Sequence, residues 1–227
     1  MNKADVCVLI PGYNEGKNIS RVVRQVIDHG FCVLVVDDGS TDSTAEEARL
    51  AGAEVLSGLK NMGKGASLRR GFEACLKKRF AAVITMDADG QHDAAELDLF
   101  LNAVNETDKE MIVGNRMHSP KNMPFVRRLT NRTMSQIISM IAKQPTPDSQ
   151  CGYRLLKREM LQKMRLSTSH FEIESEMLLE AGYRGFKIGS IPIRSVYEGG
   201  TSKIRPFRDT VRFLNFLIKY LFSRKKT

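Results

Sequence analysis

Two aspartates follow a short run near the middle of the chain. Residues 82–86 are apolar or Thr, and Asp87 and Asp89 come next with Ala88 between them. A buried strand that ends in this way brings two carboxylates to one edge of a sheet. Such hard oxygen ligands suit Mg²⁺ or Mn²⁺, ions that often hold phosphate groups in proteins. The spacing therefore predicts a divalent metal site, although an isolated Asp-x-Asp also fits a polar turn.

The end of the first apolar run carries groups that could recognise a nucleoside. Pro11 turns the chain after residues 6–10, and Tyr13, Asn14 and Glu15 follow. Tyr13 can stack on a flat ring, whereas Asn14 and Glu15 can form hydrogen bonds with a base or a ribose. Taken alone, the segment also fits an ordinary turn between a strand and a helix.

Two further polar segments extend this pattern. Asp37 and Asp38 follow the apolar run 32–36, where adjacent carboxylates are costly unless they bind donors or a cation. Lys64 opens a predicted helix, so its ammonium group and free backbone N–H groups would face a phosphate. The segment lacks the Walker spacing, and no G-x-G-x-x-G follows a predicted strand. These absences argue against a P-loop nucleoside triphosphatase and a dinucleotide oxidoreductase.

Strands and helices alternate through the first half of the chain. We expect strands over residues 6–10, 32–36, 54–56, 82–86 and 111–114, with helices beginning near residues 18, 43, 64 and 93. In the second half we expect helices over 125–141, 172–181 and 207–222 and a strand over 187–193. This alternation predicts an α/β fold with a mostly parallel sheet and helices on both faces. Ligands of such sheets bind beyond the carboxyl ends of the strands, where the polar motifs lie.

The net charge of +9 is concentrated towards the C-terminal end. Residues 194–227 hold nine Lys or Arg and two Asp or Glu. This excess suits an anionic partner, such as a phosphate-bearing substrate, a nucleic acid or an acidic membrane surface. The predicted helix 207–222 is interrupted by Arg208, Arg212 and Lys219, so we do not expect it to span a bilayer. It could lie in a membrane interface or pack on the body of the protein.

The cysteines and the N-terminus indicate a compartment. The four cysteines form no C-x-x-C pair, and we expect all of them to be reduced. The chain shows no signal-peptide pattern and no stretch of about 18 apolar residues. With the basic tail, these features predict a cytoplasmic protein that is peripheral on the cytoplasmic face of a membrane.

Four motifs occur in an order that resembles the inverting glycosyltransferases of family 2. They are P-x-Y-N-E from Pro11, D-D-G-S-x-D from Asp37, N-x-G-K-G from Asn61 and D-A-D-x-Q from Asp87. The resemblance covers essentially the whole chain and implies a GT-A fold, which is a Rossmann-like single domain. It also implies a nucleotide-sugar donor, such as GDP-mannose or a UDP-hexose.

The second half resembles a narrower group within that family. Gly114-Asn115-Arg116, Arg127-Arg128 with Ser135, and D-x-x-C-G-Y-R from Asp148 to Arg154 look like dolichyl-phosphate mannose synthases and related polyprenyl-phosphate glycosyltransferases. The match is to forms that lack transmembrane helices. It implies a polyprenyl phosphate acceptor, an anionic membrane surface as partner and no nucleic acid. Some such enzymes depend on a small membrane-anchoring subunit, which makes one a candidate partner here.

The resemblance also implies roles for individual residues. Those expected to contact the donor nucleoside are Pro11, Tyr13, Glu15, Val36 and Asp38, and we add Asn14, Asp37, Lys64 and Ala88 to the substrate-binding set. Those expected to hold Mg²⁺ or Mn²⁺ are Asp87, Asp89 and Gln91. Those expected to line the phosphate and acceptor region are Arg116, Arg128, Ser135, Arg154 and Lys203. We assign catalytic roles to Asp89, Arg116 and Arg128, and we expect Arg127 and Arg132 to form surface ion pairs.

These roles divide the single domain of residues 1–227 into three parts. Residues 1–115 would bind the nucleotide-sugar, residues 116–206 the acceptor, and residues 207–227 would form a basic amphipathic helix. A lipid phosphate is already an anion near pH 7, so it needs positioning arginines more than a base. A sugar or protein hydroxyl acceptor would instead need a carboxylate base. The candidates for that base are Asp148, Glu172 and Glu174.

Two other classes fit the sequence less well. A sugar-1-phosphate nucleotidyltransferase should show a Gly-rich turn with Arg and Lys soon after its first strand, and residues 11–16 do not form one. A nucleic-acid-binding module would explain the net charge but not the aspartate clusters, and no recognised binding motif is present.

Overall fold

The computed structural model describes residues 1–120, 123–194 and 206–224 and divides into two compact units. The first unit, Met1–Tyr197, contains the sheet and the helices from α1 to α7. The second, Glu198–Thr227, contains helix α8 (Pro206–Arg224). Lys203, which we expect to line the phosphate and acceptor region, lies outside the described residues. Within the described ranges, no helix is both long enough and apolar enough to cross a membrane.

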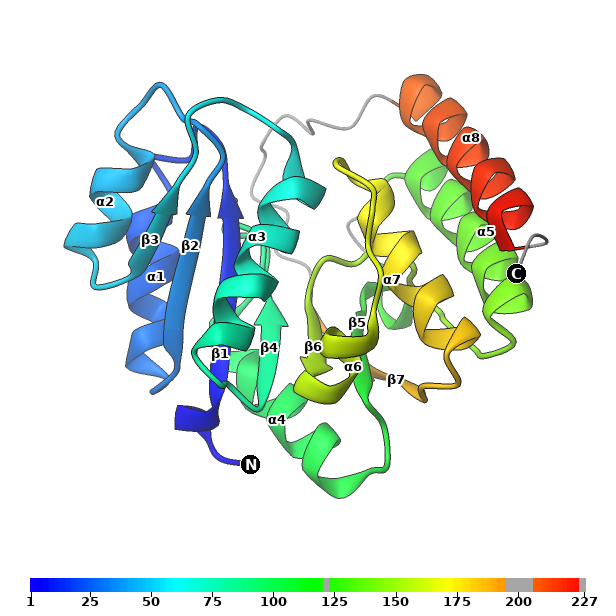
Figure 1. Cartoon of the computed structure of the whole chain (residues 1–227), viewed down its shortest axis with the longest axis horizontal. Helices are drawn as coiled ribbons and strands as arrows, with labels where there is room; N and C mark the ends of the chain where they lie inside the picture. The colour runs from blue at the N-terminus through cyan, green and yellow to red at the C-terminus, as the bar shows by residue number, and fades with distance from the viewer. Residues whose placement is uncertain (121–122, 195–205, 225–227) are drawn as a thin grey trace. The chain divides into compact units, whose positions relative to one another are not determined.

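The described part of the chain forms one seven-stranded sheet in the order β3-β2-β1-β4-β6-β5-β7 (Figure 1). The strands are β1 (Val6–Gly12), β2 (Cys32–Asp37), β3 (Glu54–Ser57), β4 (Ala82–Thr85), β5 (Met111–Asn115), β6 (Arg154–Lys157) and β7 (Ile188–Pro192). The pairs β1–β2, β2–β3, β1–β4 and β5–β7 are parallel. β6 runs antiparallel to both β4 and β5. The predicted α/β fold with a mostly parallel sheet is therefore confirmed.

Helices cover both faces of this sheet. They are α1 (Ile19–Asp28), α2 (Thr44–Leu50), α3 (Lys64–Lys77), α4 (Leu97–Glu106), α5 (Phe125–Ala142), α6 (Arg158–Lys163) and α7 (Glu172–Tyr183). Helix α1 buries the apolar residues at positions 19, 22, 23 and 26, the spacing that places side chains on one helical face. Helices α1 and α3 pack on opposite faces of the sheet, and α3 also contacts α6 and α7 (Figure 1).

Strand β6 and helix α6 were not predicted from the sequence. Leu155 and Leu156 are flanked in β6 by Arg154 and Lys157, so the strand is too short and too basic to show a clear period. Because β6 is antiparallel to β4, its first residue pairs with Thr85, the last residue of β4. This pairing brings the loop that precedes β6 to the edge of the sheet where the aspartate motif begins.

The strand register also gathers the other motifs at this edge. Pro11 pairs with Val36, and Gly12 with Asp37, across β1 and β2. A Cβ atom placed on Gly12 would lie 3.8 Å from the Cβ of Ala88, so the segment after β4 passes beside the end of β1. The carboxyl ends of β1, β2 and β4 therefore meet at one place, as expected for parallel strands.

Candidate active site

The Asp87–Gln91 segment forms a tight turn beyond β4. The Asp89 carboxylate accepts a hydrogen bond from the backbone N–H of Gln91 (3.0 Å), and Gly90 has a φ of 77°. Asp87 is half-buried and Asp89 is exposed. Desolvation and the neighbouring negative charge of Asp87 raise the pKa of Asp89. The turn therefore presents two carboxylates that are close enough to repel each other, as a cation site would require.

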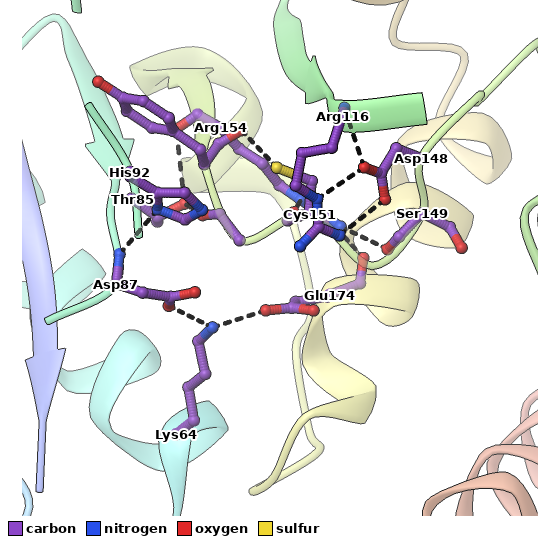
Figure 2. Close-up of polar contacts among 12 residues, drawn as sticks. Lys64, Thr85, Asp87, His92, Arg116, Asp148, Ser149, Cys151, Arg154 and Glu174 are labelled. Atoms are coloured by element: carbon purple, nitrogen blue, oxygen red, sulfur yellow. Dashed lines mark hydrogen bonds and ion pairs between the residues drawn. The ribbon is translucent and has the colours of Figure 1, made fainter. Parts of the chain in front are cut away.

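Lys64 joins the aspartate motif to the second half of the chain. Its Nζ donates to Asp87 Oδ1 at 2.5 Å and to Glu174 Oε1 at 2.7 Å (Figure 2). Burial would lower the pKa of Lys64, but the two carboxylates outweigh it and raise that pKa. Burial would likewise raise the pKa of Asp87, yet the Lys64 ammonium group outweighs it and lowers the pKa to about 2. Lys64 and Asp87 are therefore both charged at neutral pH.

His92 supports the same turn, although we assigned it no role from the sequence. Its Nδ1 accepts a hydrogen bond from the backbone N–H of Asp87 (3.2 Å; Figure 2). Its ring stacks on Tyr153 with centroids 4.8 Å apart. Burial lowers the pKa of His92 to about 4, so the ring is neutral at pH 7 and can accept this bond. Its position directly after the D-A-D-G-Q run was the signal in the sequence.

The N-terminus of α3 is not open to a phosphate, so this part of the prediction for Lys64 is wrong. The backbone N–H groups of Gly65 and Ala66 both donate to the carbonyl oxygen of Ser169, at 2.9 and 3.2 Å. Ser169 precedes α7 and lies 104 residues further along the chain, which is why no local pattern revealed the contact. Lys64 can offer a phosphate its ammonium group but not these two N–H groups.

The two aspartates at the end of β2 bind backbone donors. Asp38 is buried and accepts from the N–H groups of Met62 (3.0 Å) and Gly63 (2.7 Å). Asp37 is also buried and accepts from the N–H group of Ser40 (3.1 Å). Adjacent carboxylates at a strand end are thus satisfied by donors, one of the two possibilities that the sequence left open. Asp38 holds the segment that leads into Lys64.

The segment after β1 is tied to the segment after β2. Asn14 adopts a φ of 54°, its side-chain oxygen accepts from the N–H of Thr41 (2.9 Å), and its own N–H donates to Ser40 Oγ (2.9 Å). Tyr13 is exposed and Glu15 half-buried, so both side chains can reach a ligand. The other residues expected to bind the donor at this edge of the sheet are less accessible: Pro11 is half-buried, whereas Val36 and Ala88 are buried.

Arg116 and Asp148 form a buried, bidentate ion pair. Arg116 donates through Nε to Asp148 Oδ2 (2.8 Å) and through Nη2 to Oδ1 (2.9 Å; Figure 2). Asn131 donates to Oδ1 as well (2.7 Å). Asp148 is fully buried. Burial would raise its pKa, but Arg116 outweighs this effect and lowers it. A carboxylate with both oxygens engaged and a lowered pKa is a poor general base, so the structure argues against Asp148 in that role.

Ser135 and Arg154 lie inside the protein and hold the loop before β6. Ser135 is buried, and its Oγ accepts from the N–H of Ser149 (2.8 Å). Arg154 is fully buried and donates to the carbonyl oxygens of Cys151 (2.6 Å), Ser149 (2.7 Å) and Glu174 (Figure 2). The structure therefore does not place Ser135 or Arg154 against a ligand, because their polar atoms bind protein groups.

Arg128 is separate from this network. It is exposed on α5, and its guanidinium lies over the ring of Phe125, 5.5 Å from the centroid. Phe125, Val126 and Leu129 are 66%, 65% and 55% exposed, so the first turn of α5 presents apolar and basic side chains together. The expected acceptor residues that the structure describes thus divide into three buried groups and one exposed arginine.

Comparison with known proteins identifies the family of this chain. The family model of glycosyl transferase family 2 matches residues 7–165. The polyprenol monophosphomannose synthase of Mycolicibacterium smegmatis is 31% identical over 87% of this chain and 80% of its own. The UDP-N-acetylglucosamine–dolichyl-phosphate N-acetylglucosaminyltransferase of Methanococcus voltae is 28% identical over 85% and 86% of the two chains.

A solved structure shares the fold at low sequence identity. The glucosyl-3-phosphoglycerate synthase of Mycobacterium tuberculosis, in complex with Mn²⁺, uridine diphosphate and phosphoglyceric acid, superposes with a TM-score of 0.74. It is 18% identical, and the match covers 96% of this chain and 78% of that one. The extent of the family match and the shared GT-A fold confirm the resemblance seen in the motifs: this chain belongs to glycosyl transferase family 2 and is a glycosyltransferase.

Proposed function

We propose that this chain transfers a sugar, with inversion, from a nucleotide-sugar to a polyprenyl phosphate in a reaction that needs Mg²⁺ or Mn²⁺. The choice of a phosphate acceptor rests on the contacts of the protein's candidate base carboxylates. Asp148 is buried in an ion pair with Arg116, and Glu174 is paired with Lys64. Two of the three candidate bases for a hydroxyl acceptor are thus engaged, whereas a lipid phosphate needs no base.

The metal fits the residues at the end of β4. In the part of the chain that the structure describes, no group of three or more His, Cys, Asp or Glu is placed to hold an ion. Asp87 and Asp89, with the amide of Gln91, form a smaller set. Mg²⁺ in particular is commonly bound by one or two carboxylates together with substrate phosphates. Such an ion would stabilise the negative charge that grows on the departing nucleoside diphosphate.

The donor would lie over the ends of β1 and β2. Tyr13 would stack on the base, and Asn14, Glu15, Asp37 and Asp38 would shape the ribose site through the hydrogen bonds that join the two loops. The donor base and sugar stay open between GDP-mannose and a UDP-hexose. The M. tuberculosis structure with uridine diphosphate and Mn²⁺ supports a nucleotide-sugar donor, since this chain shares its fold.

The acceptor would approach from the side of α5. Both relatives named above carry a polyprenol or dolichyl phosphate in their names, and they differ in the sugar. Arg128 would bind the acceptor phosphate, and Arg116 would position the loop that starts at Asp148. Attack of a phosphate oxygen on the face opposite the leaving group would form the new bond as the sugar–diphosphate bond breaks, which inverts the anomeric carbon.

A lipid acceptor also requires access to a membrane. The exposed apolar turn of α5 and the basic residues of α8 suit a peripheral position on an anionic cytoplasmic leaflet. A small membrane-anchoring subunit would strengthen such a contact. Lys203 belongs to the proposed acceptor region through the resemblance to polyprenyl-phosphate glycosyltransferases.

The proposal is tested by a donor screen with a short polyprenyl phosphate, with and without metal. We expect a glycosyl phospholipid to form with one donor in Mg²⁺ or Mn²⁺ and none in excess chelator. Asp89→Ala should abolish transfer while the circular dichroism spectrum stays unchanged, because Asp89 is exposed at the sheet edge. Full activity of Asp89→Ala, or of the native chain in chelator, would remove the metal from the mechanism.

A further inference from the structure

Lys64 occupies a position between carboxylates from distant parts of the chain. Its Nζ lies 2.5 Å from Asp87 Oδ1 and 2.7 Å from Glu174 Oε1. The side chains of Lys64 and Glu174 are only 14% and 9% exposed, so little water screens the contact. Asp87 is also the first carboxylate of the proposed metal site. One ammonium group therefore holds an oxygen that the ion would use.

The surroundings leave little room for both cations. A Cβ atom on Gly152 would lie 2.9 Å from Lys64 Nζ and 2.9 Å from Asp87 Oδ2, so the backbone of Gly152 closes the site beside the ion pair. The Phe171 ring lies 5.7 Å from the same Nζ. A divalent ion on either oxygen of Asp87 would therefore sit next to an ammonium group, and like charges at such separations repel strongly.

The second aspartate is not neutralised in this arrangement. The Asp89 carboxylate accepts a hydrogen bond from the backbone N–H of Gln91 (3.0 Å), whereas the Lys64 ammonium group contacts Asp87 and Glu174. The ammonium group thus compensates Asp87 and Glu174 and leaves Asp89 with excess negative charge. A divalent ion would compensate Asp87 and Asp89 together, which a single lysine bonded to Glu174 does not do.

We propose that Lys64 competes with the divalent ion for Asp87, so that the ion binds only by displacing it. The displaced ammonium group stays beside Glu174 and binds a phosphate of the donor. Lys64 thereby couples the two ligands: the chain alone holds the ion weakly, and the donor strengthens ion binding because it gives the released lysine a new partner. This inference rests on the proposed metal-dependent function.

The test measures Mn²⁺ binding without any donor, from the electron paramagnetic resonance signal of free Mn²⁺. We expect Lys64→Met to bind Mn²⁺ at least about tenfold more tightly than the native chain, because it removes an adjacent positive charge. The matched control is Lys60→Met, which makes the same change at an exposed residue four positions away and should shift the affinity by less than about twofold.

A second arm adds GDP or UDP at saturating concentration. The nucleoside diphosphate should strengthen Mn²⁺ binding in the native chain by a larger factor than in Lys64→Met, because the variant has no ammonium group to receive the phosphate. Equal factors in the two proteins would overturn the coupling. Affinity in Lys64→Met that is equal to or weaker than native, without nucleotide, would overturn the competition.

The remaining outcomes are also decisive. If Lys64→Met is unfolded without metal, millimolar Mn²⁺ should restore its circular dichroism spectrum, since the ion replaces the lost cation, and a failure to recover would overturn the inference. Absence of Mn²⁺ binding to both proteins would overturn it as well. Native binding that Asp89→Ala abolishes, with no gain in Lys64→Met, would leave the metal site of the proposed function standing and reject only the role of Lys64.

Discussion

Arg116 donates hydrogen bonds to both carboxylate oxygens of Asp148, at 2.8 and 2.9 Å, and Asp148 is fully buried. The backbone N–H of Arg116 also donates to the same carboxylate (3.1 Å). One carboxylate therefore connects the end of β5 to the loop before β6. The pair links the two segments whose motifs first indicated a lipid-phosphate acceptor.

Breaking this pair should cost much of the stability of the domain. We expect Asp148→Asn to lower the free energy of unfolding by about 3–5 kcal/mol, because it removes the negative charge that compensates the buried Arg116 guanidinium. Arg116→Lys should also destabilise, since lysine cannot reproduce the two-pronged contact. Urea denaturation measures both. Glu54→Gln, which breaks the exposed pair with Lys78, is the control and should change little. A small effect of Asp148→Asn would contradict the buried pair.

His92 should make the domain less stable in mild acid. Its pKa is about 4 in the folded chain against an ordinary value of 6.5, so the unfolded chain binds more protons between these values. Stability from this group is therefore present above pH 6.5 and is lost as the pH falls towards 4, with a loss of about 2 kcal/mol by pH 5.

Urea denaturation at pH 7.5 and pH 5.0 measures this loss. In His92→Gln the difference between the two pH values should shrink by about that amount, although the variant is less stable at both. His118→Gln alters an exposed histidine and should leave the difference nearly native. If His92→Gln keeps the full native difference, another group is responsible for it.

Features that depend on neighbouring residues could be predicted from the sequence, whereas contacts between residues far apart along the chain could not. The positions of Asp87 and Asp89 followed from an apolar run and the rule that parallel strands end at one edge. Strand β6 was missed because two leucines between basic residues show no alternation of apolar and polar residues that would indicate a strand. Its place between β4 and β5 arises from pairing with strands that precede it by tens of residues.

In the candidate active site, too, the contacts between distant residues were not predicted. Lys64 was identified as a cation near phosphate, but its partner Glu174 lies 110 residues away and nothing local marks the pair. The closure of the α3 N-terminus by Ser169 was missed for the same reason. Arg154 and Ser135 were assigned from a motif, and only the structure shows that their polar atoms hold the loop before β6. The motifs thus marked residues at the edge of the sheet but not the distant groups that each one contacts.

Arg128 should discriminate transfer from hydrolysis. We expect Arg128→Lys to slow transfer to polyprenyl phosphate by at least about tenfold, or roughly 1.4 kcal/mol in the barrier, because lysine cannot bind phosphate in a bidentate way. Slow hydrolysis of the nucleotide-sugar by water should persist. Arg132→Lys, on the same helix and also exposed, is the matched control and should transfer normally. Equal losses of transfer and hydrolysis would place Arg128 on the donor instead.

The purified protein should bind anionic vesicles, and more weakly as salt rises, because attraction to the headgroups is screened. Two variants locate the contact: a chain that ends at residue 206, and Phe125→Ser with Leu129→Ser in α5. We expect each to reduce co-flotation with vesicles containing phosphatidylserine. If the shortened chain floats like the native one, the basic tail serves another purpose. Native binding by both variants would contradict the proposed membrane position.

The proposed phosphate acceptor is tested most directly with a matched pair of lipids. Polyprenyl phosphate and the corresponding polyprenol, with the same chain length, are each incubated with the accepted nucleotide-sugar and Mg²⁺, and the lipid products are identified by mass spectrometry and NMR. We expect a glycosyl phosphate of inverted anomeric configuration from the phosphate and no product from the alcohol. Sugar transfer to the alcohol at a comparable rate, or a product of retained configuration, would contradict the account.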